Sequence, residues 1–143
     1  MREINRRRTL LAAVALTVLG GVAQAQSFPN KPIRLICPFP PAGAVDIASR
    51  AIAAELSKNL GQPVTVENRP GAGGNIGGTE AARAAPDGYT IFMTTSGIQG
   101  INPALYAKMP FDPNKDLIPV TALVSLNNVL VLHPSIKANS VSE

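Results

Sequence analysis

The segment IRLICPFPPAGAVDIASRAIAAELSKNL, residues 33–60, decides the fold of this chain. It opens with an apolar run, Ile33–Cys37, typical of a strand that is covered on both faces of a sheet. From Val45 to Leu60, apolar residues recur every four positions and predict a helix with one buried stripe, which Gly61 is placed to end. A strand followed within a few residues by a helix indicates an α/β fold.

The loop between that strand and helix is a candidate anion site. The prolines of residues 38–43 keep the loop extended, and Gly43 allows a ligand close to the backbone. The helix begins with backbone N–H groups that have no partner inside the helix, at the positive end of its dipole. Such groups bind carboxylates or phosphates without any basic side chain. The loop sequence alone leaves an ordinary βα turn as the alternative.

The rest of the chain alternates in the same way. β-Branched and aromatic runs predict two more strands, Val64–Glu67 and Tyr89–Thr94, with an alanine-rich helix, about Ile76–Ala85, between them. Strands and helices in alternation are the pattern of a parallel sheet wrapped by helices, with the carboxyl ends of all strands at one edge. Two later apolar runs, Leu117–Leu126 and Val129–His133, are further predicted strands.

Three loops are therefore expected to face one crevice, because ligands of parallel sheets bind outside the carboxyl ends of the strands. They are residues 38–46, 68–77 and 94–100. The glycine-rich second loop lacks the dinucleotide fingerprint, since the third required glycine falls on Ile76. The candidate ligand-binding residues offer mostly backbone N–H and hydroxyl groups: Phe39, Pro40, Ala42, Gly43, Asp46, Gly73, Gly74, Asn75, Thr95, Ser96 and Gly97.

Two charged residues near these loops each have two interpretations. Asp46, in the first turn of the first helix, either stabilises the helix start or contacts an amine or hydroxyl of a ligand. Arg69 either reaches the crevice as a bidentate partner of a carboxylate or pairs with Glu67 or a neighbouring loop.

Residues 1–25 have the features of a cleavable signal peptide. Four arginines precede an apolar run, Leu10–Val22, and Ala23-Gln24-Ala25 is a typical cleavage site. Adjacent Arg7 and Arg8 leave the choice between the general and the twin-arginine export route open. Nothing after this segment is long and apolar enough to span a membrane. We therefore expect an exported protein with one domain, residues 26–143.

Charge and chemistry exclude several function classes. Without the signal peptide, nine Lys or Arg and eight Asp or Glu leave a net charge of +1, which argues against a nucleic-acid partner. Cys37 is the only cysteine and His133 the only histidine, so neither a disulfide nor a zinc site is expected, and Cys37 is predicted to be a buried thiol. An exported hydrolase using Ser96 is the alternative to a binding protein, although no histidine is close to it in sequence.

Six motifs in order then identify a resemblance: PFPPAGAVD (38–46), VENRPGAGGNIGG (66–78), APDGYT (85–90), TSG (95–97), INPALY (101–106) and PVTALV (119–124). With them the chain resembles the TctC or Bug family, the periplasmic substrate-binding receptors of tripartite tricarboxylate transporters. The resemblance implies one lobe of a type II periplasmic binding protein, a monomer that closes like a Venus flytrap on a small carboxylate. It further implies no metal or cofactor, delivery to membrane permease subunits, and a carboxylate held by loops 38–46 and 68–77 with help from the TSG loop.

Two features depart from the family pattern. The first loop has Ala42 before Gly43, where the family usually has two glycines. Receptors of the family are also much longer, so the chain is expected to stop where the first lobe crosses to the second. A truncated product with no transport role therefore remains an alternative, and the last strands are expected to leave an unpaired sheet edge.

Overall fold

The computed structural model describes residues 27–125, 127, 129–138 and 140–142, so the predicted signal peptide lies outside the described residues. The elements in chain order are β1 (Ile33–Cys37), α2 (Ala44–Leu60), β2 (Val64–Asn68), the 3-10 turn η1 (Ala72–Gly74), α3 (Asn75–Ala82), β3 (Thr90–Phe92), the π-helical turn η2 (Gly97–Ile101) and α4 (Asn102–Leu105). Among the described residues, no helix is long and apolar enough to cross a membrane.

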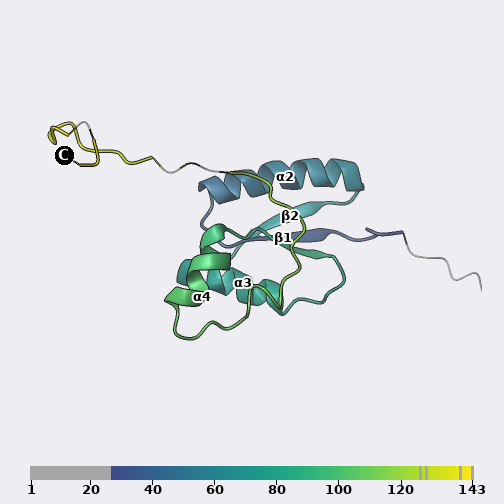
Figure 1. Cartoon of the computed structure of the whole chain (residues 1–143). Helices are drawn as coiled ribbons and strands as arrows, with labels where there is room; N and C mark the ends of the chain where they lie inside the picture. Colours follow the sequence, from purple (N-terminus) through teal and green to yellow (C-terminus); the bar gives the residue numbers. More distant parts are fainter. Residues whose placement is uncertain (1–26, 126, 128, 139, 143) are drawn as a thin grey trace, which may run out of the picture.

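The three strands form one parallel sheet in the order β2-β1-β3. In the register of this sheet, Ile36 lies opposite Glu67 on one side and Phe92 on the other. Helix α2 covers one face, and α3 and α4 lie on the other (Figure 1). The prediction of a parallel α/β lobe is therefore confirmed, with the first predicted strand at its centre.

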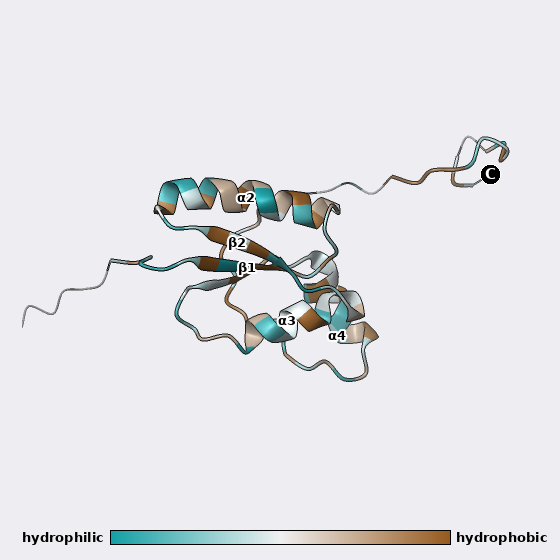
Figure 2. Ribbon diagram, turned by 180° about the vertical axis from the view of Figure 1, so that it is seen from behind, coloured by the Kyte–Doolittle hydropathy of each residue, from teal (hydrophilic) through white to brown (hydrophobic). Residues whose placement is uncertain are grey.

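The hydrophobic core lies between the sheet and α2. Strand residues that point to this face alternate along β1 and pack against Ala53 of the helix, together with Met93 after β3. Figure 2 shows the hydrophobic stretches of β1 and β2 lying along α2. The helix ends as predicted at Gly61, which has a left-handed φ of 66° and donates its N–H to Ser57 O at 3.1 Å. The stripe read from the sequence is thus the face that holds α2 on the sheet.

The opposite face carries a cluster of four charged side chains. Arg34, on the central strand, forms an ion pair with Glu67 of β2 at 2.8 Å and with Glu80 of α3 at 2.6 Å. Arg69 pairs with the same two carboxylates, each at 3.0 Å. The hydrogen bonds that Arg34 donates to Glu67 and to Glu80, in that order of importance, raise the pKa of its guanidinium. The cluster ties the start of the second loop to the sheet and to α3, and it decides between the two interpretations of Arg69 in favour of pairing with Glu67.

The two later strand predictions are wrong. The described part of residues 117–142, the C-terminal tail, contains no strand, and Ile118, Val120, Val129 and Val131 are 79–90% exposed. The tail runs past α2 and ends away from the sheet (Figure 1). A strand is stabilised by its neighbours, and these apolar residues have none in the described chain. Helix α3 and strand β3 are also shorter than predicted, ending at Ala82 and Phe92.

Close packing between α3 and the segment after α4 gives a test of the fold. An added Cβ on Gly78 would collide with Phe111 Cζ, whereas one on Gly100 would meet nothing within 4 Å. We expect Gly78→Ala to lower the free energy of unfolding by about 1–3 kcal/mol, because overpacking displaces the ring. Gly100→Ala, the matched control, should change it by less than about 1 kcal/mol. Urea unfolding of both variants measures this, and equal stabilities would contradict the packing of Phe111 on α3.

Candidate functional site

The three predicted loops meet at Gly74. A Cβ on this residue would lie 2.5 Å from Ile98 Cδ1 and 3.3 Å from Pro38 Cβ, so the second loop is in contact with both the third and the first. Only glycine fits here, since its φ of 93° is also in the left-handed region. The prediction that loops 38–46, 68–77 and 94–100 share one edge of the sheet is therefore confirmed.

The first loop forms an open surface at the start of α2. Pro40, Ala42 and Gly43 are exposed and Phe39 is half-buried. A shallow hollow of about 300 Å³ is lined by Phe39, Pro40, Pro41, Gly43, Ala44 and Val45. Gly43 precedes the helix, and no side chain caps the helix start. The first backbone N–H groups of α2 therefore lie beside this hollow without an intrahelical partner.

Asp46 lies beneath this loop and is engaged by the protein. Its side chain is only 3% exposed. One carboxylate oxygen accepts hydrogen bonds from the Ala42 N–H and from Arg50 Nε, both at 2.9 Å, and the other accepts from Asn68 Nδ2 at 2.8 Å. The Arg50 guanidinium, followed by Asn68 and the Ala42 amide, lowers the pKa of Asp46 well below its ordinary value. These contacts support the structural interpretation of Asp46 over direct ligand contact.

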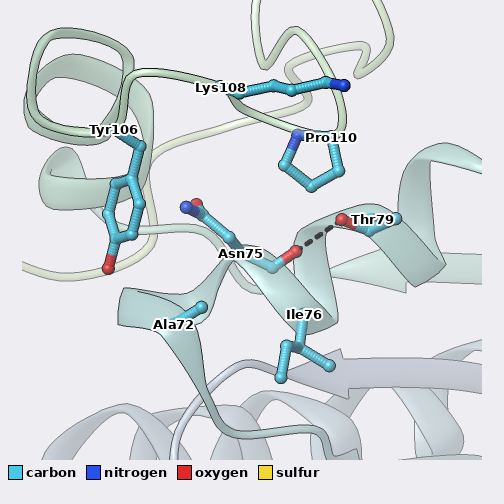
Figure 3. A pocket seen from close by; sticks show the side chains of 7 residues that line it. All are labelled: Ala72, Asn75, Ile76, Thr79, Tyr106, Lys108 and Pro110. Atoms are coloured by element: carbon cyan, nitrogen blue, oxygen red, sulfur yellow. Dashed lines mark hydrogen bonds between the residues drawn. The ribbon is translucent and has the colours of Figure 1, made fainter.

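The second loop is partly covered by the segment that follows the third. Asn75 is buried, and its Oδ1 accepts a hydrogen bond from Asn102 Nδ2 at 2.8 Å, while Asn102 also donates to Gly73 O at 3.0 Å. An added Cβ on Gly73 would lie 2.9 Å from Tyr106 Oη. A small cavity of about 150 Å³ remains there, lined by the side chains drawn in Figure 3: Ala72, Asn75, Ile76, Thr79, Tyr106, Lys108 and Pro110.

The third loop turns directly into helical structure. Thr95 Oγ1 accepts a long hydrogen bond from Ile98 N at 3.4 Å, which is a turn-forming role. Ser96 is exposed and Gly97 is half-buried. His133, the base that a Ser96 hydrolase would need, lies in the C-terminal tail with its Nδ1 hydrogen-bonded to Ser135 Oγ at 2.8 Å. The described residues thus show no hydrolase constellation around Ser96.

Two asparagines were missed by sequence reasoning. Asn68 ends β2 and connects the first loop to α2, and Asn102 starts α4 and connects the second loop to α4. Their only sequence signal is position, because each follows an element or loop end where a side-chain amide can bind backbone groups. Partners 22–29 residues away in the chain cannot be read from local sequence.

Other chemistry at this edge is limited. Cys37 is a buried free thiol, as predicted, with its Sγ 3.8 Å from Phe39 O. Within the part of the chain that the structure describes, no three His, Cys, Asp or Glu residues are grouped to hold a metal ion. What the loops offer is backbone N–H groups and hydroxyls, which recognise anions by hydrogen bonding.

Comparison with known proteins identifies the family. The profile of TctC, the tripartite tricarboxylate transporter family receptor, matches residues 48–143. The chain belongs to this family. The description of the TctC family is that of a transporter receptor and not of an enzyme, so the hydrolase alternative is not supported.

Curated relatives agree over most of the chain. Protein BugT of Bordetella pertussis is 38% identical over 142 residues, covering 96% of this chain and 44% of BugT. A UPF0065 protein from the tcbD-tcbE intergenic region of Pseudomonas sp. strain P51 is 38% identical, covering 92% of this chain and 40% of that protein. The TctC chain thus spans less than half the length of these two relatives.

Solved structures match the same region. MatC from Rhodopseudomonas palustris, determined with bound malate, has 42% identity and a TM-score of 0.65 over 67% of this chain and 33% of MatC. R. palustris Rpa4515 with adipate has 38% identity and a TM-score of 0.59 over 61% of this chain and 29% of its own. The periplasmic binding protein BugD matches with the same identity and TM-score. The parallel lobe of this TctC chain is therefore one part of the periplasmic binding protein fold.

Strain at Ala42 gives a stability prediction. Its φ of 67° is a left-handed conformation that residues with a Cβ adopt at a cost. We expect Ala42→Gly to raise the free energy of unfolding by about 1 kcal/mol. The matched control, Ala51→Gly on the exposed side of α2, should lower it by about 0.5–1 kcal/mol. Urea unfolding measures both changes, and the same sign in the two variants would contradict strain at Ala42.

The lowered pKa of Asp46 predicts how stability depends on pH. The folded state holds this carboxylate charged, so its contribution is complete above the unfolded pKa of about 4 and is lost as pH falls below it. Asp46→Asn should therefore lower the melting temperature at pH 7. The difference in melting temperature between this variant and the unsubstituted chain should become smaller as pH falls below about 4.

Thermal unfolding from pH 7 to pH 2 measures this dependence. Glu55→Gln provides the control, because Glu55 is an exposed carboxylate on the same helix. A difference between the Asp46 variant and the unsubstituted chain that stays constant with pH would show that the carboxylate is not held in its charged form.

Proposed function

We propose that this chain is part of an exported periplasmic receptor that captures a small carboxylate and delivers it to the permease subunits of a tripartite tricarboxylate transporter. The ligand is a di- or tricarboxylate or an acidic amino acid. In this proposal residues 1–25 are a cleaved signal peptide, and residues 26–143 belong to the first lobe of a two-lobed, monomeric binding protein that needs no metal or cofactor.

The observation that carries the proposal is the meeting of three loops beside the uncapped start of α2. Gly74 contacts both neighbouring loops, and the hollow beside Gly43 and Ala44 is open to solvent. A carboxylate in this hollow accepts hydrogen bonds from the first N–H groups of the helix and gains from the helix dipole. Malate and adipate, which MatC and Rpa4515 hold, are both dicarboxylates, and this agrees with the proposed ligand class.

The candidate residues divide into two roles. Phe39, Pro40, Ala42 and Gly43 line or flank the hollow and are proposed to surround the ligand. The remaining candidates support that surface or extend it from the neighbouring loops: Asp46, Gly73, Gly74, Asn75, Thr95, Ser96 and Gly97. Because the chain spans about a third of the similar solved structures, its loops supply one wall of the proposed site.

A proline at the helix start tests backbone recognition directly. Ala44 is the first residue of α2 and follows an extended Gly43 with a ψ of 165°, so proline fits without breaking the helix. Ala44→Pro removes one N–H from the hollow. We expect the affinity for malate or adipate to fall about 10-fold or more, since a hydrogen bond to a charged group contributes roughly 1.5–3 kcal/mol. The melting temperature should change little.

Isothermal titration calorimetry with malate, adipate, citrate and glutamate makes the measurement. Ala44→Ser is the matched control, because it changes the side chain and keeps the N–H. Equal affinities in the proline and serine variants would contradict recognition by the α2 amides. Absence of heat with every carboxylate from the two-lobed receptor to which this chain is proposed to belong would contradict the proposed function.

A further inference from the structure

The side chain of Asn68 joins the end of one strand to the loop that follows another. Asn68 is the last residue of β2 and pairs in register with Cys37 of β1. Its Nδ2 donates to Phe39 O at 2.9 Å and to Asp46 Oδ1 at 2.8 Å, and its Oδ1 accepts from Arg50 Nη2 at 3.1 Å. The amide thus uses both its donor and its acceptor groups on the first loop and on α2.

Asp46 extends this connection to the tip of the loop. Its Oδ2 accepts from the Ala42 N–H and from Arg50 Nε, each at 2.9 Å. Asp46 is the third residue of α2, the position from which an acidic side chain reaches back over a helix start, and here it reaches the amide two residues before the helix. The side chains of Asn68, Asp46 and Arg50 and the backbone of Phe39 and Ala42 form one hydrogen-bonded unit, the Asn68 clamp.

The clamp holds a conformation that the loop sequence does not favour. Ala42 has a φ of 67°, which costs energy for a residue with a Cβ and persists only where surrounding contacts fix it. The clamp supplies such contacts on both sides of the two prolines, at the carbonyl of Phe39 and at the amide of Ala42. Both of these groups bind the protein itself, so they are not available to a ligand in the hollow, which Gly43, Ala44 and Val45 line together with Phe39, Pro40 and Pro41.

We infer that Asn68 is a positioning residue, which fixes the first loop in the shape that leaves the start of α2 open to a carboxylate. It lines neither described hollow and acts through the Phe39 carbonyl and the Asp46 carboxylate. The part of this inference that concerns the ligand rests on the proposed function, whereas the part that concerns the loop stands on the hydrogen bonds alone.

An isosteric substitution tests the hydrogen bonds that the Asn68 amide donates without changing the size of the side chain. Asn68→Asp keeps the size of the side chain, removes both donated hydrogen bonds and puts a second carboxylate beside Asp46. We expect hydrogen exchange at the Ala42 amide to become at least about 10-fold faster, with little change at the Leu35 amide in the centre of β1. We also expect the affinity for malate and adipate to fall at least about 10-fold at a temperature where the variant is folded.

Two further variants keep the test interpretable. Asn68→Ser retains a hydroxyl donor and adds no charge, so it should give smaller changes in exchange and affinity than the aspartate. Thr65 lies on the exposed side of the same strand, so Thr65→Ala should change neither the hydrogen exchange at Ala42 nor the affinity for malate and adipate. A purely structural role for Asn68 predicts instead that exchange rises equally at Ala42 and Leu35.

The outcomes separate the two parts of the inference. Unchanged exchange at Ala42 in Asn68→Asp, or an equal rise at Leu35, would overturn it. Faster exchange at Ala42 with unchanged dicarboxylate affinity would overturn the ligand part. If the two-lobed receptor to which this chain is proposed to belong binds neither malate nor adipate, the proposed function and the ligand part both fail, and a selective rise at Ala42 still supports the positioning of the loop by Asn68.

Discussion

The parallel pairing of β1 with both of its neighbours is the constraint on which the rest of the structure depends. Because β2 and β3 run in the same direction as β1, each connection must cross a face of the sheet and return to the same end. Helix α2 makes the first crossing on one face and α3 the second on the other. The carboxyl ends of the three strands then lie at one edge, and the loops that follow them meet there.

Close packing against neighbouring segments explains the glycines of the second loop and of α3 better than a nucleotide site does. Added Cβ atoms at Gly74 and Gly77 would come within 3.4 Å of Pro38, and one at Gly78 would collide with Phe111. Glycine is needed at these positions because neighbouring protein atoms occupy the space. At the helix starts, Gly43 and Ala44 of α2 are exposed, whereas Gly74 and Asn75 of α3 are buried, so the proposed carboxylate site depends on the start of α2 more than on α3.

Local sequence predicted the first half of the domain well and the last part poorly, for one physical reason. The predicted bounds of β1, α2 and β2 agree with the structure to within a residue, because periodicity, the Gly61 cap and a shared core all favour the same elements. The tail carries equally β-branched runs, yet its described residues form no strand. Composition supplies the tendency to form a strand, and a strand forms only against a neighbour. The position of the three loops was predicted, and the clamp at Asn68 was not.

The sequence by itself therefore determined the order of strands and helices and the edge at which their loops gather, since hydrophobic spacing and the handedness of the crossovers fix both. Only the tertiary structure decided which polar groups remain available at that edge. Asp46 is occupied by Ala42, Arg50 and Asn68, while Asn75 is paired with Asn102. These pairings were decided by folding because a hydrogen bond requires its two atoms to lie within about 3 Å. Residues 22–27 positions apart in the chain reach that distance only once the sheet has brought their loops together.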